Sequence, residues 1–421
     1  MSKKFRRPKG TEDILPSKQI FWKRVNLVTE KIFSHRYMFG KIELPIFENY
    51  DLFSRSSGNS SDIVSKQMYD FYDKGGRHIA LRPEGTAGAV RAYVENKLYG
   101  PEYDKPVNLY YLGPFFRYER PQAGREREFH QLGVESFGSN SPYLDAQIIQ
   151  MALDFFSEFS IGNLEINVNT LGNKKSRYSY RNALVKYLSS YKNDLSDDSK
   201  RRLNINPLRI LDSKNNNDQK ILNEAPKIFD YLDKDSRVQF ENFLNALSNL
   251  DIDYKIDEKL VRGLDYYDHT IFEITTLNKA LQSSATICGG GRYSSMVKDF
   301  GGPDTPAIGF GIGLERLEEI ENNFNNSKVP DLYIISADKI AISFVNKLAH
   351  RLREKFNLSI LLDYNNKSVK SQFKSANRSK ARFSVVIGTK EISNHNITLK
   401  RMSDGKQKEI YLDKLSRKDF L

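Results

Sequence analysis

The sequence predicts an α+β protein of more than one domain, on three observations. Strand-like and helical segments are mixed through the first part of the chain. Residues 173–256 then have the pattern of charged helices with little sign of a sheet, and strands resume after them. Beyond the Asn-rich stretch 322–330, strands and helices alternate as in a small α/β domain. A length of 421 residues is enough for about two to four domains.

These changes of pattern also predict the domain limits. We expect a main domain formed by residues 1–172 together with 257–325, a helical insertion at 173–256 and a C-terminal domain at 330–421. The segment NNFNNSKVP has the polar composition of a linker before the last of these.

The first elements are predicted from periodicity. Between Gln19 and Phe39, apolar residues recur at the spacing of a helix with one buried stripe, and the strand-like KIELPIFE follows. RHIALRPEGTAGAVRAYVEN has the pattern of a strand, a turn and a helix that begins near Thr86. The strands VNLYYLGPFFRYER and FHQLGVESFGS flank the polar loop ERPQAGRERE, which predicts a hairpin able to close over a ligand.

The later elements combine strong and weak patterns. DAQIIQMALDFFSEF predicts a helix and LEINVNTLG a strand. LVRGLDYYDHTIFEI, residues 260–274, alternates as a strand, CGGGRY has the composition of a turn, and PAIGFGIGLERLEEIENN predicts a strand that runs into a helix. In the C-terminal domain the expected strands are DLYIISAD, SILLDY, FSVVIG and NITLKRM, with helices ending at Phe356 and beginning at Ser368.

Positive charge is concentrated at the end of the chain. Of a net charge of +12, residues 330–421 hold 19 Lys and Arg against 9 Asp and Glu, a net +10. The first 329 residues carry 46 against 44. A basic domain on a nearly neutral body predicts a polyanionic partner, most often a nucleic acid. A merely solvated charged surface is the alternative.

Composition and motifs exclude several classes of protein. No stretch approaches the ~20 apolar residues of a membrane span, and no secretory signal follows the basic N-terminus, so we expect a soluble cytoplasmic protein. The single cysteine, Cys288, excludes an internal disulfide framework and a cysteine-clustered zinc site. The phosphate loop GxxxxGK[ST] and the dinucleotide fingerprint are absent, and no serine or cysteine has the context of a nucleophile elbow. The histidines lack the spacing of metal ligands, so no metal site is predicted.

Three arginines stand beside glycine or aromatic residues rather than in solvated charge runs. They are Arg117 in FFRYER, Arg262 in LVRGLDYY and Arg316 in GLERL. Guanidinium groups match phosphate oxygens in bidentate geometry, so the three together could bind a polyphosphate. Taken singly, each is more often a surface ion pair, and Arg262 is also compatible with the exposed edge of a sheet.

Two carboxylates occupy comparable strand-end positions, Glu84 in RPEGT and Glu135 in HQLGVE. A glutamate pair in a pocket could hold a cationic ligand or act as acid and base. Local pairing with Arg82 or Arg127 is the alternative. The glycines at 289–291 allow close backbone approach to a ligand, or simply form a turn.

Four motifs in this order resemble histidyl-tRNA synthetase, a class II aminoacyl-tRNA synthetase. They are LRPEGTAGAVRAY, FRYERPQAGREREFHQLGVE, LVRGLDYY and PAIGFGIGLERL, and the likeness runs from KGTEDILP to the C-terminal domain. FRxE and GLER occur in many synthetases, whereas LVRGLDYY with RPEGT marks this family.

The resemblance implies fold, activity and partners. The implied fold is an antiparallel sheet of six or seven strands flanked by helices, with a helical insertion and a C-terminal α/β anticodon-binding domain. The implied activity is ligation of histidine to tRNA(His) through an adenylate made from ATP with Mg²⁺. The first helix and KIELPIFE look like the motif that forms the dimer interface of this class, which implies a homodimer.

The resemblance also implies the site residues. Arg117 looks like the arginine on the ATP α-phosphate and Arg316 like that on the γ-phosphate, while Arg262 reaches the reacting carboxylate and the α-phosphate. Glu119 and Phe129 match positions that contact and stack the adenine. The implied histidine-binding residues are Glu84, Gly85, Thr86, Gln131, Glu135, Arg262, Tyr266, Tyr267 and Tyr293.

Within that set, Glu84, Thr86 and Gln131 resemble the residues that hold the ammonium group. Glu135 and the tyrosines resemble the imidazole pocket. A carboxylate on one side of an imidazole and a phenol on the other would be left unpaired by a smaller or apolar ligand, so such a pocket can discriminate by about 10⁴ without editing.

The chain departs from the family pattern in three places. Glu126 stands where an aromatic is usual, which affects loop closure or tRNA contact. His269 replaces a common arginine, and Ser294 with Ser295 replaces Asp-Gly, a change we interpret as structural. The insertion lacks the cysteines of some relatives, so no metal is implied there.

Two other classes of function compete with the ligase. A non-catalytic paralogue, the regulatory subunit of ATP phosphoribosyltransferase, shares the fold and binds histidine as a signal, but such relatives typically lack the C-terminal domain and lose catalytic arginines. A plain RNA-binding module would explain the charge but not the carboxylates and glycine turns.

Overall fold

The computed structural model describes residues 4–57, 63–122, 124–159, 161–278, 281, 285–321 and 329–420. The chain divides into two compact units, Met1–Phe324 and Asn325–Leu421. Within the described part of the chain, no helix has the length and apolarity needed to cross a membrane.

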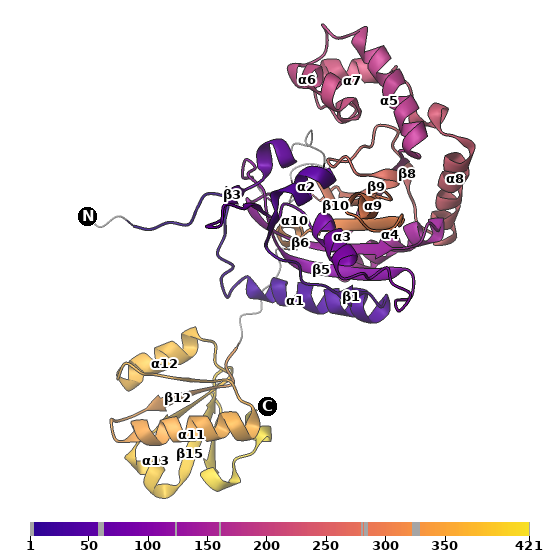
Figure 1. Cartoon of the computed structure of the whole chain (residues 1–421). Coiled ribbons are helices and arrows are strands. Elements are labelled where there is room, and N and C mark those ends of the chain that lie inside the picture. Colours follow the sequence, from indigo (N-terminus) through magenta and orange to yellow (C-terminus); the bar gives the residue numbers. More distant parts are fainter. Residues whose placement is uncertain are drawn as a thin grey trace. The chain divides into compact units, whose positions relative to one another are not determined.

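The first unit is built on an eight-stranded sheet in the order β1-β5-β6-β11-β10-β9-β7-β8 (Figure 1). The six long strands are antiparallel, as expected, and the short edge strands β1 and β8 add parallel pairs that were not expected. The strands are β1 Gly40–Lys41, β5 Val107–Phe116, β6 Glu128–Phe137, β7 Leu164–Thr170, β8 Lys255–Ile256, β9 Asp268–Thr276, β10 Ala285–Arg292 and β11 Ala307–Gly313.

Alternation along the strands gives the sheet two buried faces. Tyr110 faces the larger core, to which helices α1, α4 and α8 contribute, whereas Tyr111 faces a core shared with α3 and α9. The predicted first helix is α-helical only to its middle and continues as a π-helical segment, Glu30–Arg36. The helices are α1 Gln19–Thr29, α3 Thr86–Glu95, α4 Pro142–Ser157, α8 Lys234–Asn249, α9 Met296–Asp299 and α10 Leu314–Ile320.

A small second sheet and one further helix complete this part of the unit. The sheet has the order β2-β4-β3, and β4 is the strand predicted before RPEGT. Its elements and the neighbouring helical segments are β2 Phe47–Asn49, α2 Tyr50–Ser57, the π-helical turn Ile63–Gln67, β3 Asp70–Tyr72 and β4 His78–Leu81.

The residues expected to form an insertion are helical, as predicted. Side chains cap four of the helices at their N-termini, where Asn173, Ser196, Asn215 and Asp233 accept backbone N–H bonds. The first three helices gather around their own core, apart from the main sheet in Figure 1, whereas α8 returns to pack on α4. The elements before α8 are α5 Lys174–Ser189, α6 Asp197–Ile205, the 3₁₀ turn Pro207–Ile210, α7 Asn216–Leu222 and the 3₁₀ turn Ile228–Tyr231.

Three predictions of secondary structure are wrong. KIELPIFE, expected as one strand, is divided between the end of β1 and the start of β2, and residues 42–46 between them form neither strand nor helix. The strand expected at 260–274 begins only at Asp268, and residues 260–267 form neither strand nor helix. The glycines 289–291, expected in a turn, lie inside β10. They pack against neighbouring strands too closely for a side chain, because a Cβ on Gly290 would lie 2.2 Å from the carbonyl oxygen of Gly309.

The second unit is a five-stranded sheet in the order β13-β12-β14-β15-β16, which confirms the predicted α/β pattern. The hairpin partner β16 and the short helix α13 were not predicted. Its elements are β12 Leu332–Ser336, α11 Ala341–Phe356, β13 Ile360–Leu362, α12 Val369–Arg378, β14 Phe383–Ile387, α13 Thr389–Asn394, β15 Asn396–Arg401, β16 Gln407–Tyr411 and the 3₁₀ turns Leu412–Lys414 and Arg417–Phe420.

Candidate active site

A cavity of about 780 Å³ opens on the main sheet where β6, β9, β10 and β11 meet residues 261–263. All three predicted arginines, Arg117, Arg262 and Arg316, line it, although they are far apart in the sequence. The convergence expected of a polyphosphate site is therefore present in the fold. The other predicted residues on its wall are Glu119, Phe129 and Gln131.

Arg117 follows directly after β5 and is fixed from two sides. Its Nε donates to the Pro83 carbonyl oxygen at 2.8 Å, and its guanidinium carbon lies 5.1 Å from the centre of the Phe129 ring. Burial lowers the pKa of this guanidinium, while the nearby Glu119 and Glu84 carboxylates favour its charge. A ring and a cation thus stand together on the cavity wall.

Arg262 lies over the glycine run of β10. Its Nη1 pairs with the Glu273 carboxylate, and both side chains are mostly buried. A Cβ on Gly289 would lie 2.1 Å from the Arg262 Nη2, so the arginine needs a glycine beneath it. Burial opposes the charge, but Glu273 and the Tyr267 phenol outweigh it, and the pKa of Arg262 is raised.

Arg316, in the first turn of α10, reaches the same strand from the other side. It donates through Nη1 to the carbonyl oxygen of Thr286, whose hydroxyl donates to Glu273 at 3.0 Å. Glu273 was not predicted as a site residue. It pairs with Arg262 directly and is linked to Arg316 through Thr286 of β10. Burial and the neighbouring Arg125 lower the pKa of Arg316.

Glu135 is fully buried on β6 and is held by two phenols. The Tyr111 hydroxyl donates to it at 3.0 Å and the Tyr293 hydroxyl donates to its other oxygen. Burial raises the pKa of Glu135 to about 8, even though these hydrogen bonds favour the carboxylate. A Cβ on Gly309 would lie 1.9 Å from Oε2, so a glycine is required on the adjoining strand.

Glu84 caps the helix that follows it. Its carboxylate accepts the backbone N–H groups of Thr86 at 2.6 Å and Ala87 at 2.9 Å, at the start of α3. Burial raises its pKa. Gly85 leaves room for the ring of Tyr111, because a Cβ on residue 85 would lie 2.2 Å from that ring.

The alternative considered for these glutamates, local pairing with Arg82 or Arg127, does not occur in the described part of the chain. Arg82 donates instead to the carbonyl oxygens of Leu44 and Pro114, at 2.6 and 2.7 Å. Arg127 donates to the carbonyl oxygen of Glu119 at 3.1 Å. Both glutamates therefore remain available to a ligand as far as these arginines are concerned.

The three predicted tyrosines gather beside Glu135. The centre of the Tyr266 ring lies 4.6 Å from that of Tyr267 and 5.7 Å from that of Tyr293. These rings, Glu84, Gly85, Thr86 and Glu135 are not on the wall of the large cavity; they form a buried cluster that adjoins it. Arg262, 5.9 Å from the Tyr267 ring centre, lies at the junction.

Sequence reasoning missed two contributors besides Glu273. Tyr111 sits in an unremarkable apolar strand, and only its register opposite Gly133 marks it: a Cβ there would lie 2.3 Å from the phenol. Arg209, in the 3₁₀ turn Pro207–Ile210, lines the cavity, as do Asp212 and Lys214, which follow that turn. No sequence pattern indicates that this segment reaches the sheet.

Comparison with known proteins agrees with this geometry. Residues 10–317 match the family model described as histidyl-tRNA synthetase, and residues 331–418 match the model of an anticodon binding domain. The chain belongs to the histidyl-tRNA synthetase family. It is 50% identical over 406 residues to a histidine–tRNA ligase of Latilactobacillus sakei subsp. sakei, covering 95% of this chain and 93% of the relative. It is 48% identical over 424 residues to the Pediococcus pentosaceus ligase, covering 99% of this chain and 100% of the relative.

A solved member of the histidyl-tRNA synthetase family has the same architecture. The apo structure of the Staphylococcus aureus histidyl-tRNA synthetase superposes with a TM-score of 0.81 at 35% identity, over 97% of this chain and 98% of that one. The mixed helix-and-sheet fold with a separate C-terminal sheet domain is therefore confirmed.

The three departures from the histidyl-tRNA synthetase pattern have distinct places in the fold. Glu126 lines the large cavity, and burial raises its pKa. His269 is half-buried at a positive φ of 41°, with its N–H bonded to the Gly172 carbonyl oxygen at 3.0 Å. Ser294 donates its backbone N–H and its hydroxyl to the Asp268 carboxylate, at 2.9 and 3.1 Å.

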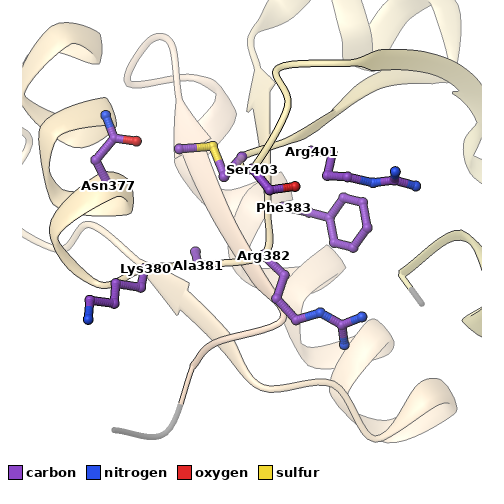
Figure 2. A pocket seen from close by; sticks show the side chains of 8 residues that line it. Asn377, Lys380, Ala381, Arg382, Phe383, Arg401 and Ser403 are labelled. Carbon is purple, nitrogen blue, oxygen red and sulfur yellow. The ribbon is translucent and has the colours of Figure 1, made fainter. Parts of the chain in front are cut away.

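The unit that matches the anticodon binding domain has a basic cavity of its own, of about 620 Å³ (Figure 2). Lys380, Arg382 and Arg401 line it with the Phe383 ring, and Figure 2 shows Arg401 beside that ring. The guanidinium carbons of Arg382 and Arg401 lie 5.9 and 6.0 Å from the ring centre. Arg382 also pairs with Asp331 at 3.3 Å. Part of the positive charge counted from the sequence thus faces one cavity.

Proposed function

We propose that this chain activates L-histidine with ATP, forming histidyl-adenylate and pyrophosphate, and then transfers the histidine to the 3′ end of tRNA(His). The observation that carries the proposal is the convergence of Arg117, Arg262 and Arg316 in one cavity beside the buried pocket of Glu135. Relatives about 50% identical over nearly the whole chain are histidine–tRNA ligases, which supports it.

The first step joins two anions. A carboxylate oxygen of histidine attacks the α-phosphorus of ATP, and the bond from that phosphorus to the bridging oxygen breaks as pyrophosphate leaves. No general base is required, because the carboxylate is already ionised at neutral pH. Fixed guanidinium groups offset the repulsion without reorganising, with Arg262 on the carboxylate and α-phosphate, Arg117 on the α-phosphate and Arg316 on the γ-phosphate.

The histidine pocket selects through groups that are costly to leave unpaired. Glu135, Tyr266, Tyr267 and Tyr293 are assigned to the imidazole, and the side chains of Glu84, Thr86 and Gln131 to the ammonium group. Burial raises the pKa of Glu135 to about 8, which favours its protonated form at neutral pH before the ligand arrives. It can therefore donate a hydrogen bond to one imidazole nitrogen, and an apolar ligand would leave that buried acid without the added partner.

ATP is assigned to the large cavity, with Phe129 and Glu119 at the adenine. Mg²⁺ accompanies the nucleotide, and its chemistry is to neutralise phosphate oxygens. Glu273, also on the cavity wall, would supply a carboxylate of the kind this ion takes, and Mg²⁺ commonly uses one or two such ligands with substrate phosphates. In the described residues no three acidic or histidine side chains cluster as a metal site, so the phosphates would complete its shell.

The remaining assignments concern the partner, the assembly and the compartment. The basic residues 330–421 are proposed to bind the anticodon end of tRNA(His), residues 1–172 with 257–325 to form the catalytic domain, and residues 173–256 to be an insertion. A homodimer through the first helix and KIELPIFE, and a cytoplasmic location, complete the proposal.

Histidine-dependent exchange of labelled pyrophosphate into ATP tests the proposal, followed by charging of tRNA(His). A ligase gives both reactions. A regulatory subunit or a plain RNA-binding protein gives neither, and absence of exchange in the wild-type chain would refute the function. The regulatory alternative is disfavoured, because the C-terminal domain is present and the three arginines share one cavity.

A further inference from the structure

Residues 260–267 carry three of the predicted histidine-site side chains, Arg262, Tyr266 and Tyr267, yet this segment has no regular structure. Strand residues are held in place by ladders of backbone hydrogen bonds, and a segment without them opens more readily. The positions of these three side chains must therefore depend on contacts made by the rest of the molecule.

Arg262 has its own partner in Glu273 of β9, and several further contacts to the segment come from the helical insertion. Arg177, one turn into α5, donates through Nη1 to the carbonyl oxygens of Asp265 at 3.0 Å and Tyr267 at 2.8 Å. Its Nη2 donates a second bond to the Asp265 carbonyl oxygen at 3.0 Å. Asn206, at the end of α6, donates to the Asp265 carboxylate. One planar guanidinium thus bridges the backbone on either side of Tyr266.

Apolar packing attaches the start of the same segment to the insertion. Val261 is buried in the core formed by α5, α6, α7 and the 3₁₀ turns between them. Its neighbours on either side face elsewhere: Leu260 packs in the core of the catalytic tyrosines, and Arg262 points into the cavity. The insertion therefore contacts the segment near both ends, at Val261 and at Asp265 and Tyr267. Arg262 and Gly263 lie between these contacts.

We propose that Arg177 is a positioning residue for histidine binding, through which the helical insertion sets the place of Arg262 and the two tyrosines. The inference rests on the proposed function. A guanidinium fork suits this task, because its rigid plane fixes two carbonyl groups relative to each other. Arg177 touches neither substrate, so its loss changes the pocket's shape and leaves the substrate contacts chemically intact.

Arg177→Met tests the proposal, because methionine keeps a long apolar stem and removes every donor. The expected result is a rise of about 10- to 100-fold in the KM for histidine in pyrophosphate exchange, because three hydrogen bonds from a charged donor are lost. The KM for ATP should change by less than about threefold, since Arg117, Arg316 and Phe129 also line the cavity assigned to ATP and Arg177 contacts none of them. Arg177→Lys should recover part of the loss, because an ammonium group can still donate to the carbonyl oxygens.

Lys175→Met is the matched control, since Lys175 is exposed on the same helix and its loss removes the same charge. It should keep wild-type constants. An Arg177→Met enzyme with an unchanged KM for histidine, or with equal losses for histidine and ATP, would overturn the positioning role.

Amide hydrogen exchange supplies a second measurement that does not need activity. Arg177→Met should speed exchange in residues 260–267, and leave residues 329–420 as in the wild type. Unchanged exchange in 260–267 would also overturn the proposal. If the wild-type chain shows no histidine-dependent reaction, the proposed function fails, whereas this measurement still decides whether Arg177 orders the segment.

Discussion

Glu135→Gln should remove a pH dependence from the stability of the first unit. Burial raises the pKa of Glu135 from 4.5 to about 8 in the folded chain. Because the folded pKa lies above the unfolded one, the folded state favours the protonated acid. Its stabilising contribution is complete below about pH 4.5 and is lost as the pH rises through about 8. Glutamine keeps the size and an acceptor oxygen for one phenol, presents an amide N–H to the other phenol, and does not ionise.

The size of the effect follows from the shift. One pKa unit corresponds to about 1.4 kcal/mol, so a shift of roughly 3.5 units is worth about 5 kcal/mol over the whole window. Between about pH 5 and pH 7 the wild-type chain should therefore lose on the order of 1 kcal/mol per pH unit relative to the variant, and the loss should level off near pH 8. Two pH units separate the two proteins by about 2 kcal/mol, which is large beside typical stabilities.

Urea unfolding followed by tryptophan fluorescence measures this difference in the right unit. Trp22 is the only tryptophan in the sequence, and it lies in the core of the first unit, so unfolding of the C-terminal unit does not contribute to the tryptophan fluorescence. The free energy of unfolding is compared for both proteins at about pH 5.5 and about pH 7.5. The exposed Glu102→Gln is the control and should keep the wild-type pH slope. Equal slopes for wild type and Glu135→Gln would refute the reasoning.

Three further predictions concern the catalytic cation, a close approach and a buried ion pair. Arg262→Ala should lower pyrophosphate exchange by about 10²- to 10³-fold with histidine binding, measured by calorimetry, largely retained; wild-type rates would contradict its role. Gly309→Ala should cost about 1–3 kcal/mol in urea unfolding, because its Cβ collides with the pocket carboxylate, whereas Gly162→Ala, with nothing within 4 Å, should be near neutral. Asp145→Asn should cost about 3–5 kcal/mol, because it leaves the fully buried Arg292 unpaired, and a loss below about 1 kcal/mol would show that the pair contributes little.

Sequence patterns correctly predicted the elements that are determined by local signals. The hairpin of β5 and β6, the helix α3 after RPEGT and the strand-to-helix passage at α10 were each placed from periodicity and turn residues. The strand expected at 260–274 failed over residues 260–267 for a physical reason. Residues on one expected face do not share one core, because Val261 packs in the core of the insertion while Tyr267, six residues later, packs with Tyr266 and Tyr293.

The glycine run of β10 shows a different limit. Glycine is common in turns, and the sequence offers no local sign that these three lie in a strand. Their cause is distant: Gly289 makes room for Arg262, and Gly290 for the carbonyl oxygen of Gly309. Tyr111 and Arg209 were missed similarly, since each reaches the site through a fold that brings remote segments together. The neighbours of the three arginines suggested that they could converge on one anion, and the family resemblance supplied the long-range information that favoured this over three surface ion pairs.

The cavity holds much of its positive charge in place before any ligand arrives, and this bears on how it can bring two anions together. Arg262 is paired with Glu273 and lies over Gly289, so its guanidinium cannot swing away. Arg316 is bound to a carbonyl oxygen of Thr286, whose hydroxyl holds the same Glu273. One carboxylate thus steadies two cations while neutralising at most one of them. Because these groups are fixed by the fold, little reorganisation remains to be made as charge shifts towards pyrophosphate, which is the condition under which electrostatic stabilisation is most effective.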